Sequence, residues 1–322
     1  MYLFHRLWVA PLMALAFAGL SGCDDRTTTV DRRIAAATPT QAVTQLVRDL
    51  RRNDLAGYAR HAVPPALHVR LDAAWRENRS RWPLTELPLH ARLPALLTTL
   101  AAPGAEKALL ATYHRQFAGA HGELRSAAAT LGQFTVQYLQ REGDVSAEQR
   151  DHYVQLTGAL SQWGQRAPLG DAKRSKVAIP QLVGAARRTG LAGDGRFGQL
   201  GMQRSLGRMG PLFGRFKQVL LAYGLDLDAA LDSVRVTLAE QTGDTARVRI
   251  RYRLAGQPID AFVRVERQGG RWYLTDALRH AEAEAETEAE AADTTPVQAH
   301  PNRPATPRPR RQSTRRRRGE SA

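Results

Sequence analysis

The stretch Thr245-Ala246-Arg247-Val248-Arg249-Ile250-Arg251-Tyr252-Arg253-Leu254 decides the fold of the last part of this chain. Apolar and basic side chains alternate along it without interruption. Because successive side chains of a strand point to opposite faces, the apolar set shares one face and the arginines share the other. The pattern predicts a strand of an antiparallel sheet that has one buried face and one basic face in contact with water.

Shorter alternating runs on both sides of this strand predict its partners. Val234, Val236 and Leu238 precede it, and the turn Thr242-Gly243-Asp244 separates the two runs. The pair Gly269-Gly270 predicts a tight turn before the last run. We therefore expect a four-stranded antiparallel meander within residues 232–278. Its core-facing side chains are expected to be Val248, Ile250, Tyr252, Val263, Val265 and Leu274.

The chain from Thr38 to Tyr223 is predicted to be helical. Thr38-Pro39-Thr40-Gln41 is a helix start, because Thr38 can cap the first turn, proline suits that turn and Gln41 completes a capping box. Apolar residues then recur at helical spacing to about Arg52. Further helices are expected at 55–61, 66–78, 93–101, 105–120, 123–141, 146–165, 177–188 and 212–223. The expected fold class is α+β, with a mostly helical N-terminal and central part and a C-terminal antiparallel β-meander.

The two ends of this predicted domain, residues 38–65 and 232–278, carry a resemblance. The helix start at Thr38, the break at Asn53-Asp54 and the closing Gly269-Gly270-Arg271-Trp272-Tyr273-Leu274 resemble small envelope lipoproteins with the nuclear-transport-factor-like, or cystatin-like, α+β cone. The resemblance implies helices packed in the curve of the sheet. It leaves open whether residues 66–225 are a helical insertion in one domain, 38–280, or a helical subdomain. This fold hosts enzymes and non-catalytic binders alike.

The N-terminal residues have the plan of a secretory signal. Arg6 precedes the uncharged apolar run 7–20, which is short for a membrane span. Leu20-Ser21-Gly22-Cys23 resembles the lipobox of bacterial lipoproteins, and Cys23 is the only cysteine of the chain. The resemblance implies that 1–22 is a signal peptide, that Cys23 is lipidated and that 23–37 is a tether. Asp24 resembles an inner-membrane retention signal, so the periplasmic face of the inner membrane is expected rather than the outer membrane.

The charge of the chain suggests anionic partners. The formal net charge is +15, with 46 Lys and Arg against 31 Asp and Glu. Beyond the bilayer that would hold lipidated Cys23, anionic lipid or an acidic envelope protein is the expected partner, and nucleic acid is disfavoured by the envelope location. The segment 196–217 has no acid and interleaves basic with apolar side chains, which suits an anionic surface, although a buried helical hairpin explains it equally. The candidate contacts are Arg196, Arg204, Arg208, Arg215 and Lys217, together with Arg315, Arg316, Arg317 and Arg318 in the tail, 281–322. This tail is expected to be disordered and acidic, then basic, although its alternating Ala/Glu run 281–292 could extend as a helix.

No motif establishes a reaction. Gly193-Asp194-Gly195-Arg196-Phe197-Gly198 matches a dinucleotide-binding pattern by letter, but a predicted helix end precedes it where a strand is required, so we interpret it as a connector. His114 and His121 are interpreted as surface residues, and Asp226 and Asp228 as caps of a short helix. The sequence therefore predicts no catalytic residue, no metal ligand and no cofactor.

These observations predict a membrane-anchored periplasmic lipoprotein that acts as a non-catalytic binding or accessory module. Three alternatives remain open. The cone could bind a small apolar ligand or lipid, and the helical part could bind a protein partner as immunity-type or scaffold lipoproteins do. An envelope hydrolase would require residues that meet only in three dimensions.

Overall fold

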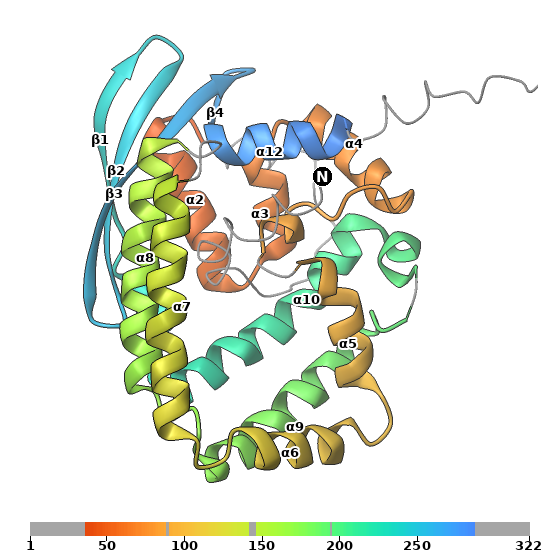
Figure 1. Ribbon diagram of the computed structural model, residues 1–322. Helices are drawn as coiled ribbons and strands as arrows, with labels where there is room; N and C mark the ends of the chain where they lie inside the picture. The colour runs from red at the N-terminus through yellow and green to blue at the C-terminus, as the bar shows by residue number, and fades with distance from the viewer. Residues whose placement is uncertain (1–35, 88–89, 142–145, 194, 287–322) are drawn as a thin grey trace, which may run out of the picture. The chain divides into compact units, whose positions relative to one another are not determined.

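The computed structural model describes residues 36–87, 90–141, 146–193 and 195–286, all of which belong to one compact unit (Figure 1). Its helices are α2 (Pro39–Arg52), α3 (Leu55–Ala62), α4 (Pro65–Arg76), η2 (Leu84–Glu86), η3 (His90–Arg92), α5 (Leu93–Ala101), α6 (Ala105–Gln116), α7 (His121–Arg141), α8 (Ala147–Arg166), α9 (Ala172–Thr189), α10 (Arg196–Ala222), α11 (Leu227–Asp232) and α12 (Thr275–Glu286). Its strands are β1 (Arg235–Thr242), β2 (Thr245–Leu254), β3 (Gln257–Gln268) and β4 (Arg271–Leu274). The predicted α+β class is confirmed. None of the helices in the described ranges is long and apolar enough to span a membrane.

The predicted meander is present, with the four strands antiparallel and in the order β1-β2-β3-β4. Val248 faces Val263 across the β2–β3 pair, and Ile250 faces Ala261, all of them buried. On the other face Arg251 and Arg253 are exposed, as the alternation predicts. Hydrophobic burial on one face thus fixes the register, because a slip by one residue would turn these apolar side chains to water.

Helix α2 covers the inner face of the sheet. The Thr38 side chain accepts from Gln41 N at 3.3 Å, which confirms the predicted cap, while Gln41 Oε1 reaches Ala37 N at 2.9 Å and not Thr38 N. Ala42 and Val43 pack against the sheet in one apolar cluster. The helix ends at Asn53, whose φ of 70° is left-handed.

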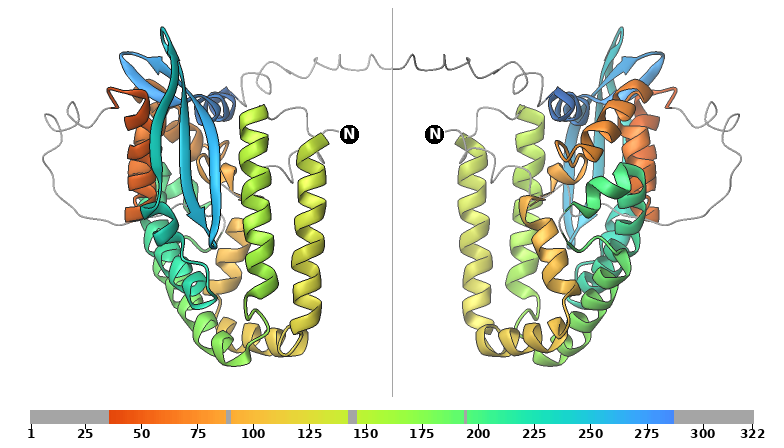
Figure 2. Two further views of the ribbon diagram at one scale, coloured as in Figure 1. Left: turned by 90° about the vertical axis from the view of Figure 1, so that its left-hand side faces the viewer. Right: turned by 90° about the vertical axis from the view of Figure 1, so that its right-hand side faces the viewer.

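Helix α8 lies beside the edge of β3. In the described residues, β4 pairs only with positions 265–268 of β3, so the earlier part of β3 has no strand on that side. Gln155 of α8 bonds that edge twice: its Nε2 donates to Asp260 O at 2.8 Å, and Asp260 N donates to its Oε1 at 2.9 Å. Helix α7 packs on α8 and is the outermost helix of this pair in the side view (Figure 2).

The predicted start of the helix in residues 196–223 was wrong. Instead of a connector followed by a helix from Leu212, α10 begins at Arg196 and contains one non-helical residue, Gly201, with φ 73° and ψ 172°. The Asp72 carboxylate accepts from Met202 N at 2.9 Å and so caps the helix that resumes after Gly201. Glycine tolerates this backbone conformation, and tertiary contacts supply the stability that the local sequence lacks.

Several other boundaries differ from the prediction; helix α6, for example, ends at Gln116 and not at residue 120. Helix α9 starts at Ala172 because the Asp171 side chain caps it, whereas a start at Val177 was expected. Helix α12 runs to Glu286, so residues 281–286 are not part of a disordered tail. Ala281 is fully buried, and Ser80 Oγ donates to Glu284 Oε2 at 2.8 Å. Residues 287–322 lie outside the described residues.

Candidate functional site

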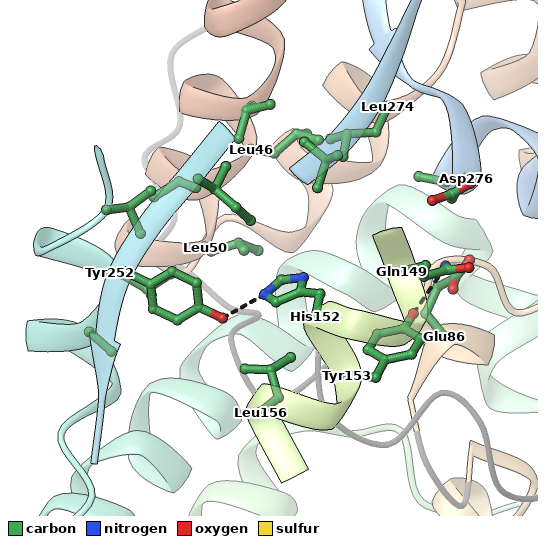
Figure 3. A pocket seen from close by; sticks show the side chains of 18 of the residues that line it. Leu46, Leu50, Glu86, Gln149, His152, Tyr153, Leu156, Tyr252, Leu274 and Asp276 are labelled. Carbon is green, nitrogen blue, oxygen red and sulfur yellow. Dashed lines mark hydrogen bonds between the residues drawn. The ribbon is translucent and has the colours of Figure 1, made fainter. Parts of the chain in front are cut away.

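A cavity of about 190 Å³ lies between the inner face of the sheet and helices α2, α8, α11 and α12 (Figure 3). Its lining is mostly apolar: Leu46 and Leu50 come from α2, Leu156 from α8 and Leu274 from β4. An engineered apolar cavity of about 150 Å³ is known to hold benzene, so a space of this size suits a single ring or a short chain. Since α2, α8 and the sheet meet here, residues more than 200 positions apart line one space.

The most buried polar side chain of this lining is His152, which pairs with Tyr252. His152 Nε2 and Tyr252 Oη lie 2.8 Å apart, and the two rings meet edge to face with centroids 5.9 Å apart. His152 is 2% exposed, and burial lowers its pKa to about 4, so the imidazole is neutral near pH 7. Burial also raises the pKa of Tyr252. The pair is therefore an uncharged hydrogen-bonding group inside an apolar space.

A second group of polar side chains, Glu86, Gln149, Asp276 and His280, also lines the cavity, and we call it the mouth. Figure 3 shows Glu86, Gln149 and Asp276 on the side of the cavity away from Tyr252. Glu86 Oε2 and His280 Nδ1 lie 3.0 Å apart, and the side chains are 25% and 51% exposed. Gln149 Nε2 donates to Tyr153 Oη at 3.2 Å. Burial and then the charge of Glu86 raise the pKa of Tyr153.

The His152–Tyr252 pair does not have the arrangement that a hydrolytic site requires. A hydrolytic site needs a nucleophile beside a base that a third group orients. His152 has a tyrosine partner, and Tyr252 is its one hydrogen-bond partner among the described residues. Within the same residues there is no group of three or more His, Cys, Asp or Glu side chains that could hold a metal ion.

A carboxylate–imidazole pair occurs elsewhere, at Asp49 and His61. Asp49 Oδ2 and His61 Nδ1 lie 2.7 Å apart, and Asp49 is 3% exposed. The third partner is Gln45, whose Nε2 donates to Asp49 Oδ1 at 2.9 Å. Because this neighbour is an amide and not a nucleophile, the pair reads as a polar link between α2 and α3.

The basic residues predicted on segment 196–217 separate into two kinds. Arg196, Arg204 and Arg208 are exposed, and Arg215 is half-buried. Lys217 is 3% exposed: its Nζ donates to Arg51 O at 3.3 Å and pairs with Asp228, and burial lowers its pKa. The prediction of Lys217 as a surface contact is therefore wrong, because the ammonium caps the C-terminal end of α2.

The other predicted positions are placed as follows. Asp226 caps α11, accepting from Ala229 N at 2.8 Å, as predicted, whereas Asp228 pairs with Lys217. His114 lies on α6 and His121 begins α7, both exposed. Cys23, Asp24 and Arg315 to Arg318 lie outside the described residues, so their predicted roles stay predictions.

Sequence reasoning missed His152 and Glu86. A signal for His152 was present, because it lies on the same face of α8 as Tyr153 and Leu156, where a charged imidazole would be costly. Nothing in the local sequence distinguishes Glu86, which reaches the mouth only through the turns after α4. Comparison with family models, with curated proteins and with solved structures returned no match for this chain. The resemblance to the cone fold therefore stays a proposal.

Proposed function

We propose that this chain is a periplasmic lipoprotein, anchored through Cys23, that acts as a non-catalytic binding module for a small apolar ligand. The cavity between the sheet and α8 is the observation that carries the binding role. Ligand sites in proteins are concave, mostly apolar and fitted with a few polar groups, and this space has all three properties. The neutral His152–Tyr252 pair would orient an uncharged polar group of the ligand.

The size of the cavity limits the size of the ligand that it can hold. About 190 Å³ is smaller than the range of about 300–1,000 Å³ that drug-sized ligands occupy. A diacyl lipid would therefore not fit inside, whereas a six-carbon chain or one ring would. Burial of such a group gains roughly 0.8 kcal/mol per CH₂.

Calorimetric titration with hexan-1-ol tests the binding role, on a soluble chain without residues 1–22 and with Cys23→Ser. Ala277 lines the cavity at the start of α12, so Ala277→Trp should fill it and abolish the heat of binding. Ala111 is exposed on α6, so Ala111→Trp is the matched control and should bind as the parent does. Equal binding by the two variants would refute the cavity as the site.

The anchor has a separate test. Labelled palmitate fed to cells should enter the wild-type protein and be absent from Cys23→Ser, since thioether lipidation needs a thiol at the cleavage site. Label in the Cys23→Ser protein would refute the anchoring. Conversion of Asp24 to Ser should move the protein between membrane fractions if Asp24 carries the inner-membrane signal.

A further inference from the structure

The charges at the mouth of the cavity oppose those of the chain. One residue in seven is Lys or Arg, 46 of 322, yet none of the described residues that line the cavity is either of them. The charged lining side chains are instead the carboxylates of Glu86 and Asp276, accompanied by His280. A chain whose overall charge attracts anions thus lines its apolar space with two carboxylates and, among the described residues, with no lysine or arginine.

The two carboxylates retain capacity for another donor. Glu86 pairs with His280, and Asp276 forms an ion pair with Arg264, which lies outside the lining, with Arg264 Nη2 3.1 Å from Asp276 Oδ1. An ionised carboxylate has about four acceptor sites, so one or two bonds do not saturate it. The Tyr153 ring lies beside them in the lining, and aromatic faces attract cations.

The interior beyond the mouth offers an apolar space and an uncharged pair. Leu156 is 3% exposed and Ile250 is 5% exposed, and both line the cavity. An anionic ligand would have to bring its charge past two carboxylates with no arginine or lysine of the described lining to receive it, which is unfavourable. An ammonium head would meet two carboxylates at the entrance, while its apolar part entered the cavity.

From this arrangement, and resting on the proposed function, we infer that the ligand is a small apolar amine. Its cationic head lies at Glu86 and Asp276, and its chain or ring extends toward His152. A fatty acid or other anionic amphiphile is the ligand class that the mouth rejects.

Three six-carbon ligands that differ only in the head group test the inference: hexylamine, hexan-1-ol and hexanoate, titrated into the soluble chain at pH 7 and low salt. We expect hexylamine to bind about tenfold more tightly than hexan-1-ol, and hexanoate more weakly than both. Hexanoate binding as tightly as hexylamine would overturn the inference and leave the cavity proposal standing. Absence of binding by all three ligands would overturn both.

A pair of charge variants assigns the effect to the mouth. Glu86→Gln keeps the shape and an acceptor for His280, so it should reduce hexylamine affinity about tenfold and leave hexan-1-ol unchanged. Glu77→Gln removes an exposed carboxylate just after α4, whose partner is Arg79, and is the matched control. Equal loss of amine and alcohol affinity in Glu86→Gln would overturn the inference, because it would make Glu86 a structural residue.

Discussion

The inner and outer faces of strand β2 alternate along the same ten residues but lie in opposite environments. The inner face is buried, and the outer face is in contact with water. On the inner face Val248, Ile250 and Tyr252 exclude water, Ile250 and Tyr252 also line the cavity, and His152 of α8, which bonds Tyr252 there, is kept neutral. On the outer face the arginines stay charged, and Arg251 lies directly opposite Arg235 on β1. The difference shows that burial restricts the inner face to uncharged groups. The outer face tolerates even like charges, because water and salt screen them.

A charge placed on the inner face should have the largest effect. Ile250→Asp would bury a carboxylate without a partner and should destabilise the domain by more than about 4 kcal/mol, enough to unfold it. Arg251→Glu, one position along on the outer face, should change the free energy of unfolding by less than about 0.5 kcal/mol. Urea unfolding of the two variants measures both, and similar midpoints would contradict the assignment of the faces.

Lowering the pH should challenge the inner face next. A histidine has a pKa of about 6.5 in an unfolded chain, and burial lowers that of folded His152 to about 4. Between these values the unfolded chain binds the additional proton, so stability falls as the pH drops from about 6.5 to 4, by up to about 3 kcal/mol. Unfolding at pH 7, 6, 5 and 4.5 checks this. The variant His152→Phe keeps all the other titrating groups and is therefore the control. It should lose less stability than the parent as the pH falls from 7 to 4.5.

Removal of the Tyr252 hydroxyl should cost less again. Tyr252→Phe leaves buried Nε2 of His152 without its partner, a loss of about 1–3 kcal/mol. In the His152→Phe background the same change should cost much less, because the partner is already gone. A double-mutant cycle that gives no coupling between the two positions would show that the 2.8 Å contact does not stabilise the fold.

The outer ion pair should give the smallest effect. Arg249 Nε donates to Asp260 Oδ1 at 2.8 Å, and the pair holds the pKa of the Asp260 carboxyl below its usual range. Both side chains are solvent-exposed, so Arg249→Gln should leave the thermal midpoint unchanged in 0.5 M NaCl. A large shift there would mean that the outer face is covered. Arg249→Gln is a better test of this ion pair than Arg249→Asp, because an aspartate at position 249 would place two carboxylates together.

Local patterns predicted the elements of the fold where local chemistry decides them. The alternation of β2 located one strand and its two faces, and Thr38, Ser146 and Asp226 each cap the helix that was expected to follow. These signals work because a cap or a face depends on residues within a few positions.

The cavity and the start of α10 could not be predicted in the same way. His152 and Tyr252 are 100 residues apart in the sequence, so only the packing of α8 against the sheet joins them. The glycines between 193 and 214 argue against a helix, and α10 is held by a distant carboxylate, Asp72. Lys217 looked like a surface cation because its burial depends on Asp228 and the end of α2.

The side-chain amide of Gln155 has a consequence for the solution behaviour of the chain. An open sheet edge is a template on which another molecule can add a strand, and proteins protect such edges to stay soluble. Gln155 offers Asp260 one donor and one acceptor, the same pair of groups that a neighbouring peptide unit would offer. A single glutamine on a helix thereby occupies the position that a peptide unit of another strand would take at Asp260, so no further strand can pair with the edge at that residue.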